Sequence, residues 1–122
     1  QGMLYIIINE GLNFPNKPKT VSYYVTLKSK SGVKAGSKPC LMGKNNTSHP
    51  IWNEHLELSE VEIGEALKVN IIDVKEEKSV NRLVGTAEIE VKDGEVGESK
   101  TNDSKITFCM YADSLNLLQS WM

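Results

Sequence analysis

The sequence predicts an all-β protein, an antiparallel β-sandwich with one core, and two observations support this prediction. Several segments alternate apolar and polar residues with a period of two, which is typical of strands that bury one face and expose the other. Seven or eight such segments follow one another at near-regular spacing, with turn residues between them. The 122 residues are enough for one domain with a core and too few for two.

The first half of the chain contains four predicted strands. Residues 3–9 form a continuous apolar run, as expected for a central strand that is covered on both faces. Residues 10–19 contain glycine and two prolines and are predicted to be a loop. The alternating segment 22–30 is the second strand, 37–42 is a third and weaker one, and the fourth begins at Trp52.

The second half of the chain repeats the alternating pattern. One strand surrounds Leu67 and another covers 83–91, with a highly charged loop at 75–82 between them. We expect Trp52 to be substantially buried. The inward side chains of the two strands that are expected to share one core are Leu67, Val69, Ile71, Ala87, Ile89 and Val91.

The last 31 residues are harder to assign. Residues 92–104 show no apolar periodicity and are predicted to be a mobile connection, whereas 105–111 alternates and is the seventh strand. The tail, 113–122, fits two structures. It is either an eighth strand or a short helix that Asp113 caps and that buries Leu117, Leu118 and Trp121.

Charge is distributed unevenly, although the net charge is only −2. Residues 11–53 contain no acid, whereas 54–122 contain 15 acidic and seven basic residues. An asymmetry of this kind suggests that one surface meets an anionic partner. The seven lysines of the basic part are Lys17, Lys19, Lys28, Lys30, Lys34, Lys38 and Lys44.

Catalytic and nucleic-acid-binding motifs are absent from the sequence. His49 precedes a proline and His55 lies on a predicted strand face, and neither accompanies a nucleophile elbow or a phosphate-binding loop. We therefore expect no catalytic residues, no enzyme activity and no nucleic-acid partner. Cys40 and Cys109 lie in separate predicted strands and are expected to be buried free thiols rather than a disulfide.

Three motifs, in this order, resemble those of a C2 domain. They are Pro50-Ile51-Trp52-Asn53-Glu54, a following strand that ends in Asp73, and Leu83-Val84-Gly85. The sequence of residues 24–28 also resembles a strand of this family. The resemblance covers nearly the whole chain and implies an eight-stranded Greek-key sandwich whose first strand leads directly into the first apical loop. Since the chain begins with Gln1, we expect a single C2-like domain over 3–122, excised from a larger protein.

The resemblance also raises the question of calcium, because many C2 domains bind it through five aspartates on two apical loops. Only one of the five corresponding positions is acidic here, so we expect no metal site and no cofactor. Asp73 is then expected to bond loop amides. Glu76 and Glu77 are either substitute ligands or, beside neighbouring cations, parts of exposed ion pairs. The five positions correspond to Asn16, Ser22, Asp73, Lys75 and about Arg82.

In the C2 family a lysine-rich patch on the corresponding strands binds phosphoinositides and other anionic lipids. The resemblance therefore implies a non-catalytic, calcium-independent trafficking module, cytoplasmic and peripheral to the membrane, that binds phosphoinositides, phosphatidic acid or phosphatidylserine. The expected lipid-binding residues are Lys28, Lys30, Lys34, Lys38 and Lys44, and the expected loop-tip membrane contacts are Phe14, Lys17 and Lys19.

Two alternatives remain open at the level of sequence. The lysines are also consistent with an ordinary solvated strand face. The domain is also consistent with a protein–protein module that dimerises or binds a trafficking or scaffold partner without lipid. That alternative predicts an exposed apolar or aromatic patch around Tyr23, Tyr24 or Trp121.

Overall fold

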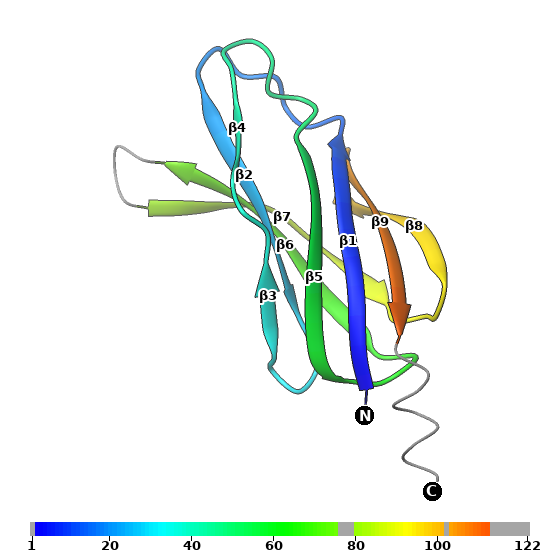
Figure 1. Ribbon diagram of the computed structural model, residues 1–122. Helices are drawn as coiled ribbons and strands as arrows, with labels where there is room; N and C mark the ends of the chain where they lie inside the picture. The colour runs from blue at the N-terminus through cyan, green and yellow to red at the C-terminus, as the bar shows by residue number, and fades with distance from the viewer. Residues whose placement is uncertain (1, 76–79, 102, 113–122) are drawn as a thin grey trace, which may run out of the picture.

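The computed structural model describes residues 2–75, 80–101 and 103–112, which form two antiparallel sheets packed face to face (Figure 1). One sheet has the order β5 (Ile51–Val61), β1 (Gly2–Leu12), β9 (Ser104–Ala112) and β8 (Glu95–Thr101). The other has the order β3 (Lys34–Gly36), β2 (Val21–Lys28), β6 (Ala66–Lys75) and β7 (Val80–Glu90), and β4 (Cys40–Met42) also pairs with β2. The predicted all-β sandwich is confirmed. No helix that could cross a membrane occurs in the described part of the chain.

The core lies between the sheets and follows the alternation of the sequence. Leu67, Val69 and Ile71 of β6 are fully buried, and β1 and β2 contribute every second side chain in the same way. Trp52 and Ala87 pack against this core but are only partly buried. The Trp52 ring is nonetheless fixed, because its Nε1–H donates a hydrogen bond to the carbonyl of Tyr23 at 3.0 Å.

β1 is central in its sheet, as predicted, but it is not covered on both faces. Its inward side chains are buried, whereas Tyr5 and Ile7 on the other face remain partly exposed. Tyr5 stacks on Tyr111 of the neighbouring β9, with ring centroids 5.4 Å apart. A continuous apolar run therefore fits a strand whose second face is only partly shielded by aromatic neighbours.

The strand beside β2 is broken into two pieces, so the two sheets have eight strand positions in the described residues. β3 pairs with the end of β2 and β4 with its beginning. Between them, Ser37 takes the place of a strand residue. Its backbone N–H donates to the carbonyl of Val25 at 2.8 Å, and its hydroxyl accepts the N–H of Val25 at 2.9 Å.

Two predictions about the connections are wrong. The segment 92–104 is not only a connection, because it contains β8, which pairs along β9 at the edge of its sheet. The charged loop at 75–82 is also shorter than predicted, since β7 begins at Val80. The alternatives for the tail 113–122 lie outside the described residues.

Candidate functional site

Two loops, between β1 and β2 and between β4 and β5, form the apical end of the sandwich at the top of Figure 1. Thr47, which is fully buried, joins them. Its hydroxyl donates to the carbonyl of Pro15 at 2.8 Å and accepts the N–H of Lys17 at 2.7 Å. The carbonyl of Lys17 accepts the N–H of Asn45 at 2.8 Å. The backbone of Lys17 is therefore held on both sides.

The predicted membrane contact at Phe14 is wrong, because this ring is buried with only 3% of its surface exposed. The ring contacts Tyr23 edge-on, with centroids 5.1 Å apart, and lies 6.2 Å from Trp52. Its N–H donates to the carbonyl of Ser48 at 3.0 Å. Gly11 makes room for it, since a Cβ there would lie 2.7 Å from the ring. Phe14 anchors the loop to the core.

Asp73 is almost fully buried at 1% exposed and lies on the inner face of β6, near the apical end. Nζ of Lys17 lies 3.2 Å from its Oδ2 and forms an ion pair with it. The expected role of Asp73, bonding loop amides, is therefore replaced by this pair in the described structure. Lys17 is also not a free loop-tip cation, because its side chain is only 23% exposed and points to Asp73.

The residues described at this end do not fit calcium. Calcium takes six to eight oxygen ligands, several of them carboxylates. The described residues hold no group of three or more His, Cys, Asp or Glu side chains placed for a metal. Asp73 already faces an ammonium group, which would repel an incoming cation. Glu76, Glu77 and the side chain of Lys75 lie outside the described residues.

Tyr23 lies beside this pair and has a perturbed phenol. Burial raises the pKa of Tyr23 above its usual value, the negative charge of Asp73 raises it further, and the nearby Thr47 hydroxyl lowers it in part. The phenol oxygen is buried and has no hydrogen-bond partner in the described structure. Tyr23 is therefore a core residue, and the predicted exposed patch cannot centre on it.

Three lysines line up at the other, basal end of the sandwich. Lys28 at the end of β2 lies directly opposite Lys34 of β3 on one side and Lys68 of β6 on the other. Neighbouring Cβ atoms in such a row are about 5 Å apart. All three side chains are exposed, and none forms an ion pair within the described residues. We call Lys28, Lys34 and Lys68 the lysine row.

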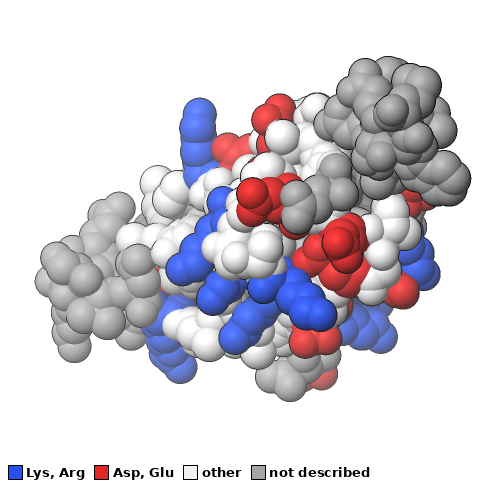
Figure 2. All heavy atoms as spheres, turned by 90° about the horizontal axis from the view of Figure 1, so that it is seen from below, with Lys and Arg blue, Asp and Glu red and all other residues white. Residues whose placement is uncertain are grey.

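Figure 2 views the molecule from this end and shows lysine or arginine side chains gathered there, with acidic side chains beside them. The next position along the row, on β7, is Glu88, which faces Lys68 and ends the basic surface. In the described residues the row is therefore bounded on one side by acid and open over the outer face of the sheet.

The structure does not bring the other predicted lysines into the row. The backbone N–H of Lys30 donates to Glu65 at 2.8 Å and that of Lys38 donates to Glu54 at 2.6 Å, so a carboxylate lies beside each backbone, although neither ammonium group forms an ion pair in the described residues. Lys44 follows β4 at the apical end, where Lys19 is also exposed. The two ends of β2, Val21 and Lys28, are seven residue steps apart, or about 23 Å.

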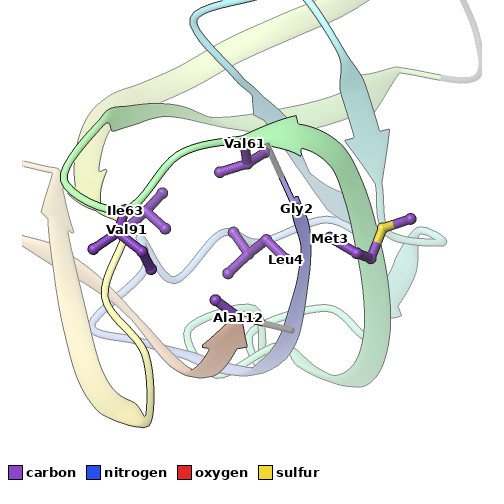
Figure 3. A pocket seen from close by; sticks show the side chains of 7 residues that line it. All are labelled: Gly2, Met3, Leu4, Val61, Ile63, Val91 and Ala112. Atoms are coloured by element: carbon purple, nitrogen blue, oxygen red, sulfur yellow. The ribbon is translucent and has the colours of Figure 1, made fainter. Parts of the chain in front are cut away.

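A small apolar cavity opens at the basal end between the two sheets (Figure 3). Leu4, Ile63 and Val91 contribute to its wall, and every residue that lines it is apolar. Among the described residues, therefore, no polar side chain lines the cavity to orient a ligand. The cavity is the open end of the core.

The remaining reactive side chains are dispersed. His49 pairs with Glu10 at 2.8 Å, and both are at the surface. Cys40 and Cys109 are free, as expected, but each is only partly buried. Asn9 Nδ2–H approaches the sulfur of Cys109 at 3.5 Å. These groups make local contacts and do not converge on one site.

Two residues of the candidate site were missed by sequence reasoning. Lys68 lies outside the basic half of the sequence and enters the row only through the pairing of β2 with β6. The period-two alternation of β6 predicts an outward side chain at Lys68, and this is the one sequence feature from which its place could have been predicted. Thr47 has no such signal, because a buried loop threonine looks like any other threonine before the chain folds.

The comparisons agree with this architecture. A family model described as C2 domain matches residues 2–107. A search of curated proteins finds no match. Among solved structures, one entitled "Structure of a C2 domain" has a TM-score of 0.71 and 13% sequence identity, over 93% of this chain and 99% of that one.

Two further similar structures are a single C2 domain and a much longer enzyme chain. A C2 domain of plant extended synaptotagmin 1 has a TM-score of 0.68 and 13% identity, over 92% of this chain and 94% of that one. Human GIVD cytosolic phospholipase A2 has a TM-score of 0.66 and 19% identity, over 90% of this chain but only 16% of that one. With the family match over most of its length, the chain belongs to the C2 domain family.

Proposed function

We propose that this domain is a non-catalytic module that recruits its parent protein, without calcium, to the cytoplasmic surface of anionic membranes. C2 domains are in general membrane-binding or protein-binding modules, and the family membership makes either role accessible. The observation that favours the membrane is the lysine row, in which three exposed cations lie on adjacent strands and form no ion pair among the described residues, although Glu88 stands opposite Lys68.

The spacing of the three lysines favours a headgroup that presents several phosphate oxygens to their ammonium groups. Each lysine ammonium offers three donors on a flexible stem, so three neighbouring lysines can converge on one phosphate or on adjacent phosphates. Phosphoinositides present the densest charge of this kind, and phosphatidic acid and phosphatidylserine present less. We therefore expect the affinity to fall in that order.

Energy sets a limit on this function. Each lysine near an anionic bilayer contributes about 1 kcal/mol, so the row contributes about 3 kcal/mol, which is less than a millimolar complex requires. The domain therefore acts together with a second anchor elsewhere in its parent protein. The apical loop does not supply that anchor through Phe14, because the ring is buried.

Calcium independence is supported by the ion pair between Lys17 and Asp73. The ammonium group supplies the positive charge next to the one retained acid of the family pattern. We expect about 1 mM calcium to leave the melting temperature unchanged, since a ligand that binds only the folded state must raise it. A saturable calorimetric signal below about 100 µM would contradict this expectation.

Because the row alone binds more weakly than a millimolar complex, it is tested by cosedimentation at about 10 mM lipid, with vesicles of phosphatidylcholine alone or mixed with phosphatidylserine, phosphatidic acid or a phosphoinositide. Replacing Lys28, Lys34 and Lys68 together by Glu should abolish binding to the anionic vesicles. The matched control replaces Lys30, Lys38 and Lys44 by Glu, which changes the net charge equally but leaves the row intact.

The control decides between a specific surface and overall charge. If both triple variants lose binding to the same extent, the lysine row has no special role. If the wild type does not prefer anionic vesicles, the membrane function itself fails. Binding should also weaken as ionic strength rises, because exposed charges are screened.

A further inference from the structure

Beyond the lysine row, toward the apical end, part of the outer face of the same sheet carries apolar side chains. The row that crosses β4, β2 and β6 contains Leu41 and Val74 with the small, buried Ser22 between them, and the following row contains Tyr24, Ile72 and Leu83, which gives five apolar residues. Alternation places all five on the face opposite the core. We call these five residues the apolar floor. Its two outermost residues, Leu41 and Leu83, are its rims.

The rims are the most exposed part of this surface. Leu41 on β4 is 72% exposed and Leu83 on β7 is 58% exposed, whereas Tyr24, Ile72 and Val74 between them are partly buried and Ser22 is buried. Three strand spacings separate β4 from β7, or roughly 14 Å. An α-helix with its side chains is about 10–12 Å across, so it fits between the two leucines and covers the residues between them.

The same face offers a second contact further along the strands. From Tyr24 to Lys28 is four residues of β2, or about 13 Å, which equals about nine residues of a helix lying along the strand. Thr26 and Asn70 occupy the row between, opposite Gly36, and are small or polar enough to let a helix pass. A helix on the apolar floor therefore reaches the lysine row.

Charge complementarity identifies the chemistry of the partner at that point. The three cations of the row favour acidic side chains, and they also favour the negative C-terminal end of a helix dipole. The twist of the sheet argues against a flat partner on this face, since adjacent strands rotate by roughly 20–25°. In Figure 1 the β6–β7 hairpin turns away from β1 and β5.

We propose that the outer face of the β3-β2-β6-β7 sheet binds an amphipathic helix of a protein partner, with its apolar stripe on the apolar floor and acidic side chains on the lysine row. This inference goes beyond the proposed membrane function. The two share only the lysine row, so a helix with an acidic end and an anionic headgroup compete for the domain.

The probe is a synthetic helical peptide with leucines at i, i+3, i+4 and i+7 and glutamates about nine residues beyond the centre of that stripe. NMR spectra of the isotope-labelled domain should show shifts at the apolar floor and the lysine row when it is added. A peptide with lysines in place of the glutamates should bind about tenfold more weakly, and Leu41→Glu or Leu83→Glu should each weaken the first peptide about tenfold.

Matched control variants are Ile51→Glu and Ile63→Glu, which change other exposed apolar residues, 53% and 49% exposed, and should leave peptide binding unchanged. The proposal is overturned if the peptide causes no shifts at millimolar concentration, if the shifts lie elsewhere, or if the lysine peptide binds equally well.

It is also overturned if the wild type binds uncharged phosphatidylcholine vesicles and Leu41→Glu and Leu83→Glu abolish that binding. In that case the apolar floor is a membrane contact and not a protein site. Loss of anionic-vesicle binding in the lysine-row variant alone would leave the apolar floor intact, so a failure of this inference and a failure of the membrane function are distinguishable.

Discussion

The two ends of the sandwich use lysine in opposite ways. At the apical end, Lys17 is fixed by backbone hydrogen bonds on both sides and its ammonium group is paired with a buried carboxylate. At the basal end, the lysine row is exposed and without ion pairs in the described residues. The first is part of the fold, and the second is available to a ligand. The comparison shows that a lysine count says little until the partner of each side chain is known.

Phe14→Ala should give the largest effect, because it removes the ring that holds the apical loop. Truncating a buried aromatic side chain costs about 3–5 kcal/mol, so the free energy of unfolding should fall by this amount in urea denaturation. Ile51→Ala, at an exposed apolar residue, is the control and should have little effect. If Phe14→Ala weakened vesicle binding without changing stability, the ring would be a membrane contact after all.

Lys17→Met should come next, since it leaves the Asp73 carboxylate buried without its ion-pair partner. We expect a loss of about 1–3 kcal/mol, less than for a fully buried pair, because the Lys17 side chain is 23% exposed. Lys19→Met in the same loop should change little. Adding Asp73→Asn to Lys17→Met should recover part of the loss, and equal stability of the Lys17 and Lys19 variants would contradict the structural role.

Tyr23→Phe should be smaller and of opposite sign. It removes a buried hydroxyl without a hydrogen-bond partner, so we expect a gain of about 1 kcal/mol. The pKa of Tyr23 is raised, first by burial and then by Asp73, so the unfolded chain ionises first as the pH rises above 10.0. The contribution of the neutral Tyr23 phenol to the free energy of unfolding is therefore fully present below that pH, and it is lost as the pH rises toward the raised pKa.

The alkaline loss of stability should be reduced in Tyr23→Phe and retained in Tyr24→Phe, on the opposite face of the same strand. Melting temperatures measured across the alkaline range give this comparison. Identical pH profiles for wild type and Tyr23→Phe would show that the phenol does not ionise within the stable range.

Lys28→Met should have the smallest effect on stability, within about 0.5 kcal/mol of the wild type, because the side chain is exposed. Its effect should appear in vesicle binding instead. A stability loss as large as that of Lys17→Met would remove the difference between the two ends of the molecule.

Local pattern predicted most of the fold. The alternation around Val25 and Ile71 identified inward faces because the period of a strand is a property of neighbouring residues. β8 was missed because its sequence is polar and contains Gly97, and it is held as a strand by pairing with β9 alone. A polar edge strand gives little signal in its own residues.

The site was less predictable, since it depends on contacts between distant residues. Lys17 and Asp73 are 56 residues apart, and no periodicity links them. Phe14 was wrongly assigned to the surface because prolines and asparagines surround it, although its ring points inward. Lys68 belongs with Lys28 only through strand register. Of the five predicted lipid-binding lysines, only Lys28 and Lys34 lie in the row.

The break at Ser37 also affects the tendency of the domain to aggregate. β3 and β4 have three residues each, and the Ser37 hydroxyl stands where a backbone carbonyl would otherwise accept from β2. An intruding strand meets no continuous ladder of free N–H and C=O groups along this side, which is what edge-to-edge growth requires. The domain can therefore carry the exposed Leu41 at an open edge without offering a template for cross-β assembly.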